Sequence, residues 1–340
     1  MTDLILNCIK IDMSKITLSN GSSFVCQSEQ TLLEAARAQG LMLEHSCRTG
    51  RCGVCKAHVL TGETLPLKEE ESLTENERAS GLVLTCCRTA LTDTELDIED
   101  LGELGSIEVK TLPCRIDSLA LLSDDVIEVV LRTPPSSRLT YLSGQYVDVI
   151  GKNGLRRSYS IANAPREDGK IILQVRKVLN GEMSRYWFAE AQVNDLLRIE
   201  GPLGTFCLRK SQASHLVLLA TGTGIAPIKA MLETLAANPS LNSYQQISLY
   251  WGGRTEKDIY WTPDFPGLDV HFTRVLSRTP SSGDIKGYVQ DATLADGFDL
   301  QESIVYACGS EAMIESARKQ LISAGLHHKN YHSDAFVSSN

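Results

Sequence analysis

Four cysteines constrain this chain more than any other feature of its sequence. Cys47, Cys52 and Cys55 are spaced C-x4-C-x2-C, and Cys86 follows about thirty residues later. A loop with this spacing can wrap around a bound group and aim three thiolates inward, while the fourth arrives from a distant segment. This is the ligand spacing of a plant-type 2Fe-2S cluster, so the sequence predicts a protein that handles single electrons.

The fourth ligand and the bound group both have alternatives. Cys86 and Cys87 are adjacent, and because neighbouring strand residues point to opposite faces, only one of them is expected to face the cluster. Cys-x2-Cys is also a zinc half-site, and cysteines can form a disulfide framework. One compact triplet facing a lone late ligand differs from the paired units of a zinc knuckle. Gly50 and Gly53 also favour a cluster loop, because glycine reaches backbone conformations closed to other residues and lets amide N–H groups approach the sulfurs.

Length and composition indicate a multidomain enzyme. The 340 residues exceed what one core usually organises, which predicts two or three domains, and 42% hydrophobic residues suffice for real cores. The start of the chain lacks the features of a signal peptide and no stretch approaches membrane-spanning length, so a cytoplasmic protein without membrane association is expected. In a reducing compartment the remaining thiols are expected to be packing residues, among them Cys8, Cys26, Cys114 and Cys207.

Charge is distributed unevenly along the chain. Residues 1–105 carry 17 acidic and 9 basic side chains, whereas the remainder carries 25 and 24. An acidic surface of this kind can steer association with a basic docking surface and disfavours nucleic acid, although ordinary solubilising charge explains it equally well.

Local signals predict the elements of the first domain. Asn20-Gly21 between two alternating segments predicts a hairpin in which both turn residues have positive φ. Thr31-Leu-Leu-Glu34 has the form of a capping box and predicts a helix that stops at Gly40. Residues 1–12 precede this unit. We expect them to be a flexible extension, or to reflect a start codon upstream of Met13.

The segment from about residue 108 to 209 alternates apolar and polar residues, as in 125–131 and 145–150, which predicts an antiparallel β-barrel. It contains Arg157-Ser158-Tyr159-Ser160 and, after an expected strand 171–178, Gly181-Glu182-Met183-Ser184. An arginine fork suits a phosphate, an aromatic face suits a flat ring, a hydroxyl suits a ring heteroatom, and a glycine turn with a serine suits a pyrophosphate.

From about residue 211 strands and helices alternate, which predicts a doubly wound parallel sheet. A strand 216–220 runs through Thr221-Gly222-Thr223-Gly224-Ile225-Ala226-Pro227 into a helix 228–235. Gly222 and Gly224 permit a close approach to a pyrophosphate, Pro227 suits the first helical position, and a helix N-terminus favours negative charge. Further on, a strand ends at Cys308-Gly309 and Ser310 is expected to cap a helix 311–324. The histidines near the end, His327, His328 and His332, are expected to form a solvated tail and not a metal site.

In this order the motifs resemble the ferredoxin-NADP reductase superfamily with a fused N-terminal ferredoxin, from about Met13 onward. The resemblance implies a multidomain α+β and α/β protein. Its parts are a β-grasp 2Fe-2S ferredoxin domain at 13–102, an FAD-binding β-barrel at 108–209 and an NAD(P)H-binding α/β domain at 211–340.

The resemblance also implies roles for residues. Cys86, in Val-Leu-Thr-Cys, is the fourth cluster ligand, Arg157 holds a flavin phosphate, Tyr159 stacks on the isoalloxazine and Ser160 approaches its N5. The turn from Gly181 to Ser184, with Met183, holds the FAD pyrophosphate, and the turn from Thr221 to Pro227 holds that of the nicotinamide cofactor. Cys308 and Gly309 lie beside the nicotinamide, Phe336 covers the flavin side, and Arg254 contacts either an adenine ribose or a 2'-phosphate, so NADH is favoured but NADPH stays possible.

A closer resemblance is to the reductases that supply electrons to the pyridoxamine-phosphate-dependent (PMP-dependent) dehydratase of 3,6-dideoxyhexose biosynthesis. The segments that carry it are 43–47, 111–118, 157–163, 201–206 and the C-terminal Ser-Asp-Ala-Phe336, and several of them lie outside the cofactor sites. It implies an oxidoreductase whose electrons pass from NADH through FAD and the 2Fe-2S cluster to that dehydratase. A reductase component of an aromatic-ring dioxygenase or a monooxygenase, and a redox sensor, remain as alternatives.

Overall fold

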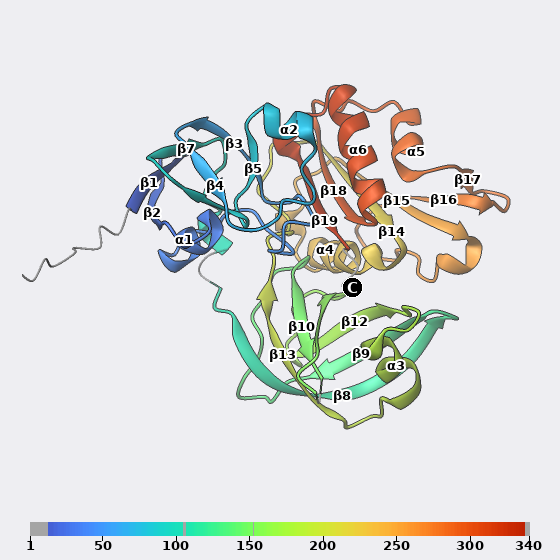
Figure 1. The fold of residues 1–340 in the computed structure, drawn as a ribbon. Coiled ribbons are helices and arrows are strands. Elements are labelled where there is room, and N and C mark those ends of the chain that lie inside the picture. Colours follow the sequence, from blue (N-terminus) through green and yellow to red (C-terminus); the bar gives the residue numbers. More distant parts are fainter. Residues whose placement is uncertain (1–12, 105–106, 152, 337–340) are drawn as a thin grey trace, which may run out of the picture. The chain divides into compact units, whose positions relative to one another are not determined.

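The computed structural model describes residues 13–104, 107–151 and 153–336, and the predicted extension 1–12 lies outside them (Figure 1). The chain divides into two compact units, Met1–Ser106 and Ile107–Asn340. No helix in the described ranges is both long and apolar enough to cross a membrane.

The first unit is a mixed five-stranded sheet in the order β2-β1-β7-β3-β5. Strands β1 and β7 pair in parallel at its centre, the other neighbours are antiparallel, and helix α1 packs on the sheet. This is the predicted β-grasp arrangement. Its elements are β1 (Met13–Leu18), β2 (Ser23–Gln27), α1 (Leu32–Ala38), β3 (Lys56–Thr61), β4 (Thr64–Pro66), α2 (Glu75–Ala79), β5 (Leu82–Leu84), β6 (Arg88–Ala90), β7 (Thr94–Leu96) and a 3-10 turn, η1 (Gly102–Leu104).

Two local predictions for this unit are confirmed, one of them with a correction. Thr31 caps α1. Its hydroxyl accepts the N–H of Glu34 at 3.2 Å, and the Glu34 carboxylate accepts the N–H of Thr31 at 3.0 Å. The hairpin β1–β2 also forms, but only Gly21 has a positive φ, of 84°. The prediction that Asn20 shares this conformation is wrong, because the turn spans four residues and the Asn20 side chain instead accepts the N–H of Ser22 at 3.2 Å.

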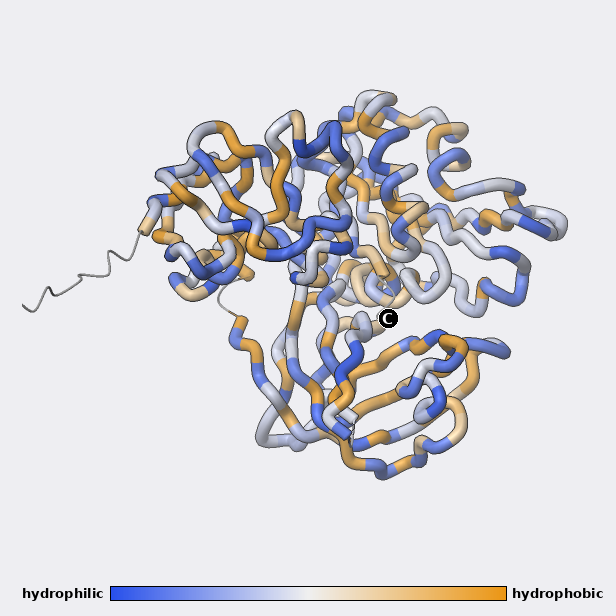
Figure 2. Tube along the Cα trace, in the orientation of Figure 1, coloured by the Kyte–Doolittle hydropathy of each residue, from blue (hydrophilic) through white to orange (hydrophobic). Residues whose placement is uncertain are grey.

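The second unit begins with a six-stranded antiparallel sheet in the order β11-β10-β13-β8-β9-β12. It closes on itself as the predicted barrel, since Ile161 bridges to Leu173 and the Ala162 N–H donates to the Ile172 carbonyl at 2.8 Å. Hydrophobic and hydrophilic residues alternate along parts of the barrel strands (Figure 2), most regularly in β8, where Leu112, Cys114 and Ile116 are buried in the barrel core and the residues between them are exposed. Its elements are β8 (Lys110–Ser123), β9 (Val126–Arg132), β10 (Tyr146–Ile150), β11 (Arg156–Ser160), β12 (Lys170–Arg176), α3 (Glu182–Arg185), a π-helical turn η2 (Tyr186–Glu190) and β13 (Leu196–Leu203).

The rest of the second unit is a six-stranded parallel sheet in the order β17-β16-β15-β14-β18-β19. The chain leaves β14 in one direction and returns to its other side at β18, so right-handed crossovers place α4 on one face and α5 with α6 on the other (Figure 1). This is the predicted doubly wound sheet. Its main elements are β14 (His215–Thr221), η3 (Gly222–Gly224), α4 (Ile225–Ala237), η4 (Pro239–Leu241), β15 (Gln246–Thr255), η5 (Glu256–Asp258), β16 (His271–Thr279), β17 (Ile285–Lys286), α5 (Val289–Ala295), β18 (Ser303–Gly309), α6 (Glu311–Ser323), η6 (His328–Asn330) and β19 (Tyr331–Ala335).

The structure corrects two expectations in this sheet. Helix α4 begins at Ile225, so Pro227 is its third residue and not its first; a proline is tolerated there because the N–H groups of the first turn have no helical partner. The predicted histidine tail is wrong for His332, which lies on β19, is 8% exposed and packs its ring 4.9 Å from that of Tyr306. The Ser310 cap on α6 is confirmed, with its hydroxyl accepting the Met313 N–H at 3.4 Å.

Candidate redox-cofactor sites

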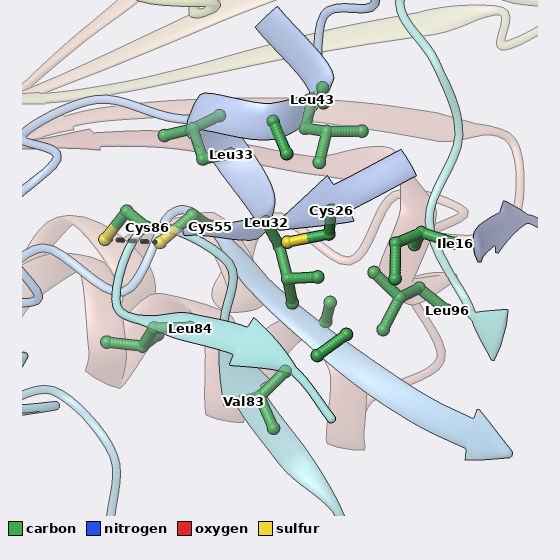
Figure 3. Packing of buried hydrophobic residues seen from close by; sticks show 14 of the residues in the cluster. Ile16, Cys26, Leu32, Leu33, Leu43, Cys55, Val83, Leu84, Cys86 and Leu96 are labelled. Carbon is green, nitrogen blue, oxygen red and sulfur yellow. Dashed lines mark hydrogen bonds between the residues drawn. The ribbon is translucent and has the colours of Figure 1, made fainter. Parts of the chain in front are cut away.

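The thiols of the cysteine loop form two pairs. The N–H of Cys47 donates to the Cys52 sulfur at 3.5 Å, that of Cys52 donates to the Cys47 sulfur at 3.4 Å, and the two thiols interact. The sulfurs of Cys55 and Cys86 lie 3.2 Å apart (Figure 3). A 2Fe-2S cluster needs two protein ligands on each of its two irons, so two pairs of thiols fit it.

Cys86 and Cys87 do not lie on a strand, as the alternating-face argument assumed. Strand β5 ends at Leu84, and both cysteines lie in the following turn with their sulfurs 3.5 Å apart. Cys87 donates to the backbone carbonyl of Glu69 at 3.4 Å, whereas Cys86 pairs with Cys55. The geometry therefore favours Cys86 as the fourth ligand, for a reason other than strand alternation.

The backbone of the loop is in the left-handed region at three positions. Arg48 has φ 59°, Gly50 has φ 82° and Gly53 has φ 67°, which confirms the expectation for the two glycines. A Cβ on Gly50 would lie 2.3 Å from the carbonyl oxygen of Glu69. The backbone at Glu69 therefore requires glycine at this position, whether or not the Gly50 N–H group approaches a cluster.

The four residues of the Arg157–Ser160 motif form most of strand β11. The Tyr159 ring meets Trp187 edge to face at 6.2 Å, and the Tyr159 hydroxyl accepts the indole N–H of Trp187 at 3.0 Å. Burial raises the pKa of Tyr159 to about 12, so its hydroxyl stays protonated at neutral pH. Ser160 is buried at the strand end, and Ser158 donates to the Asp148 carboxylate at 2.6 Å. Trp187, which sequence reasoning missed, thus holds the Tyr159 ring in a fixed orientation.

The second barrel motif starts helix α3, with Gly181 at the N-cap. Met183 and Ser184 are buried, and the Ser184 hydroxyl accepts the N–H of Val178 at 2.8 Å. Ser184 therefore shapes the turn between β12 and α3. The turn presents backbone N–H groups of the kind that bind phosphate.

The glycine turn after β14 lies at the carboxyl end of the parallel sheet. Ala220 pairs with Cys308 on the neighbouring parallel strand β18; strands β15 to β17 lie on one side of β14, whereas β18 and β19 lie on the other, so the strand order reverses between β14 and β18. This is the position at which doubly wound sheets bind ligands. A Cβ on Gly224 would lie 2.1 Å from the Cys308 carbonyl oxygen, so β18 itself requires the glycine.

The strand end at Cys308 and Gly309 is joined to both neighbouring segments. The Thr221 hydroxyl accepts the Ser310 N–H at 3.0 Å, and the Phe336 N–H donates to the Gly309 carbonyl at 2.9 Å. Cys308 is completely buried, and burial raises the pKa of its thiol well above the usual range. Phe336 is 39% exposed. The structure thus brings Thr221, Cys308 and Phe336 to one sheet edge.

Arg176 is a second residue that sequence reasoning missed. Its Nε and Nη2 atoms lie 2.8 Å from the carboxylates of Asp125 and Asp258, and its Nη1 would be 2.7 Å from a Cβ on Gly222. The two carboxylates hold the guanidinium beside the glycine turn, where a phosphate would meet it. Arg254, the residue expected to contact either an adenine ribose or a 2'-phosphate, is exposed, and its backbone N–H donates to the Asp258 carboxylate at 3.0 Å.

Helix α4 ties the glycine turn to the flavin motif. The Lys229 ammonium donates to the Ala162 carbonyl at 3.0 Å, and the Glu233 carboxylate accepts the Ala164 N–H at 2.8 Å. Ala162 and Ala164 follow directly after strand β11. One helix therefore starts at the expected nucleotide turn and holds the chain beside Tyr159 and Ser160.

Comparisons with known proteins agree with this division of roles. Family models match residues 16–92 (2Fe-2S iron-sulfur cluster binding domain), 113–207 (oxidoreductase FAD-binding domain) and 218–319 (oxidoreductase NAD-binding domain). These matches define an oxidoreductase whose cofactors are a 2Fe-2S cluster, FAD and NAD. The limits 13–102, 108–209 and 211–340 stay predictions.

The chain is similar over nearly its whole length to several known proteins. It is 42% identical to the CDP-6-deoxy-L-threo-D-glycero-4-hexulose-3-dehydrase reductase of Yersinia pestis, with 94% of this chain and 97% of the relative covered. It is 38% identical to protein RfbI of Salmonella typhimurium over 98% of this chain and 97% of the relative. Among solved structures, the cytochrome P450 reductase GcoB of Amycolatopsis aligns with a TM-score of 0.71 at 31% identity, over 95% of this chain and 98% of that one. The chain belongs to the family of iron-sulfur flavoprotein reductases that includes these CDP-hexulose dehydrase reductases.

Proposed function

We propose that this protein passes electrons from NADH to a PMP-dependent CDP-4-keto-6-deoxyhexose 3-dehydratase, which removes the C3 oxygen in the biosynthesis of CDP-3,6-dideoxyhexoses for surface polysaccharide. The observation that carries the proposal is the 42% identity to a reductase named for that dehydrase, which extends across all three domains. A cytoplasmic location, where nucleotide sugars are made, is part of the proposal.

The cofactors supply chemistry that the side chains lack: flavin accepts a hydride from the nicotinamide and passes electrons singly, and the cluster carries one electron at a time. The chain's own task is to bind and align these groups. Tyr159, held by Trp187, would stack on the flavin ring, and Ser160 would lie near its N5. Arg157 and the Gly181–Ser184 turn would bind the FAD phosphates, with Met183 packed beneath the turn.

On the nucleotide side, the turn from Thr221 to Pro227 would bind the pyrophosphate, with Arg176 supplying positive charge beside Gly222. Cys308 and Phe336 would border the nicotinamide at the end of β18. The four thiols of Cys47, Cys52, Cys55 and Cys86 would hold the cluster.

The test is an anaerobic reconstitution of the purified protein with NADH, the dehydratase and its CDP-4-keto-6-deoxyhexose substrate, followed by assay of the 3-deoxygenated product. Product that depends on both this protein and NADH is expected. Dye reduction in a parallel sample without any deoxysugar would show that the electron chain works and that the acceptor is wrong.

A second candidate acceptor is an oxygenase. The chain is 32% identical to reductase component 2 of the terephthalate 1,2-dioxygenase of Comamonas sp, with 93% of this chain covered. Domain order and cofactors are shared, so only the acceptor distinguishes the two functions. Failure of the dehydratase assay with intact dye reduction would favour this candidate.

A further inference from the structure

One of the four candidate cluster ligands is more accessible than the others. Cys52, Cys55 and Cys86 are 6%, 4% and 1% exposed, whereas Cys47 is half-buried. A groove of about 320 Å³ opens at this edge, between helix α1 and the cysteine loop, and Cys47 and Cys86 lie in its wall. An electron passes to a partner more readily where its carrier lies close to the surface, and the half-buried Cys47 marks such a place on this unit.

The wall of the groove is basic. Its charged residues are Arg37, Arg48 and Lys68, against a single carboxylate, Glu34. Lys68 pairs with Glu34 at 3.3 Å, but the two side chains are 46% and 55% exposed, so the pair is weak and can open when a partner approaches. Arg48 has φ 59° and directly follows Cys47.

This local charge is opposite to that of the unit as a whole, which has 17 acidic and 9 basic side chains in residues 1–105. An acidic partner would be repelled by most of the unit and attracted at the groove. Opposed charges arranged in this way favour one docking orientation and disfavour others. The orientation favoured here brings the partner to the groove, where Cys47 is half-buried.

We propose that the basic groove formed by Arg37, Arg48 and Lys68 is the docking surface for the electron-accepting protein, which meets it with acidic side chains. The inference rests on the proposed function and names the surface that serves it. It differs from the hypothesis that the acidic charge of this unit steers association with a basic docking surface, and it is compatible with ordinary solubilising charge elsewhere on the unit. Each docking passes one electron, and two dockings deliver the two electrons of one NADH, which becomes NAD⁺ while its proton goes to solvent.

The test uses full-length Arg48→Gln, Lys68→Gln and the double variant, with Lys15→Gln on β1 as the matched control, an exposed lysine of the same unit outside the groove. The dehydratase with its substrate is the protein acceptor. We expect the groove variants to raise KM for the dehydratase several-fold and to weaken its salt dependence, because a rim charge acts mainly on association. The Lys15 variant should match the wild type.

Two further measurements separate the alternatives. The rate at which NADH reduces the cluster is followed in the same variants; a fall there, with no change in KM, would mean that the groove faces the flavin unit of its own chain and would overturn the proposal. Reduced protein is also mixed with the cobalt(III)-EDTA anion or the hexaamminecobalt(III) cation. The double variant should reoxidise more slowly with the anion and faster with the cation.

The cobalt measurement does not depend on the dehydratase. If the wild type reduces its cluster but passes nothing to the dehydratase, the proposed function fails, while the cobalt rates still decide whether electrons leave through the groove. Equal rates for the double variant and Lys15→Gln with both complexes would overturn the docking surface, whatever the acceptor.

Discussion

Gly50 is the residue of the cysteine loop with the least room. A Gly50→Ala side chain would lie 2.3 Å from the Glu69 carbonyl oxygen and 2.8 Å from the Cys87 sulfur, at a φ of 82°. We expect this variant to lose most of its iron and sulfide, measured per mole of protein, because the loop must move away from Glu69. Gly21→Ala is the control: its φ is 84° but no atom lies within 4 Å, so it should keep its cluster and lose only about 1 kcal/mol of stability.

His215 gives a prediction for pH dependence. Burial, and then the neighbouring charge of His271, lower the pKa of His215 below its usual 6.5. The unfolded chain therefore binds a proton more readily than the folded one, so the free energy of unfolding should fall as the pH drops below about 6.5.

The corresponding variant is His215→Gln, which keeps a polar group beside the Ser248 hydroxyl that lies 2.9 Å from the ring. Its thermal unfolding should depend less on pH between about 5 and 7 than that of the wild type. Parallel pH profiles for the two proteins would contradict the assignment.

At the scale of elements, Glu70 holds the turn between β5 and β6. Its carboxylate is almost fully buried, accepts the Leu84 N–H at 2.9 Å and pairs with Arg88 at 3.0 Å, so it binds both ends of the turn that carries Cys86. Glu70→Gln would leave Arg88 without its countercharge, and we expect a loss of about 2–4 kcal/mol in unfolding free energy together with lower cluster content.

The neighbouring Glu71 supplies the control. It pairs with Arg51 at 3.1 Å, but the side chains are 46% and 38% exposed. Glu71→Gln should therefore change the unfolding free energy by less than about 1 kcal/mol. Similar cluster loss in both variants would show that the charge near the loop matters and the buried pair does not.

Helix α4 offers a prediction about alignment. Lys229→Met removes the bond from α4 to the Ala162 carbonyl, next to the flavin motif. Because a small misplacement of reacting groups is costly, we expect flavin reduction by NADH to slow by about tenfold or more, with flavin content retained. Lys257→Met is the control, since its ion pair with Asp124 also joins the barrel to the α/β sheet but is 84% and 91% exposed. Stopped-flow absorbance of the flavin measures the rate of its reduction in both variants. Equal rates for Lys229→Met and Lys257→Met would contradict the role of α4.

At the scale of the whole molecule, each unit has its own core. One cluster of buried side chains lies within residues 16–96, and two others lie within the second unit. Residues 107–340 expressed alone should therefore fold, bind FAD and reduce ferricyanide with NADH, while losing transfer to the protein acceptor. A fragment that still drives the dehydratase would show that electrons bypass the cysteine loop.

The parts of this protein that the sequence predicts are those whose cause is local. The Thr31 capping box, the Gly21 turn, the Ser310 cap and the alternating barrel strands each depend on residues a few positions apart. The same holds for the cysteine loop, where the close spacing of three ligands leaves the chain few paths around a bound group.

Tertiary structure decided whatever depends on residues distant in the sequence. The turn between β5 and β6 places Cys86 toward Cys55 and Cys87 toward the Glu69 carbonyl, which a strand-alternation argument could not predict. Trp187 behind Tyr159 and Arg176 beside Gly222 are joined to their partners only by folding. The basic groove is of the same kind, because Arg37, Arg48 and Lys68 lie on three separate segments of an acidic unit. Composition averages charge over the whole unit, whereas a partner meets only the side chains that the fold brings to one face.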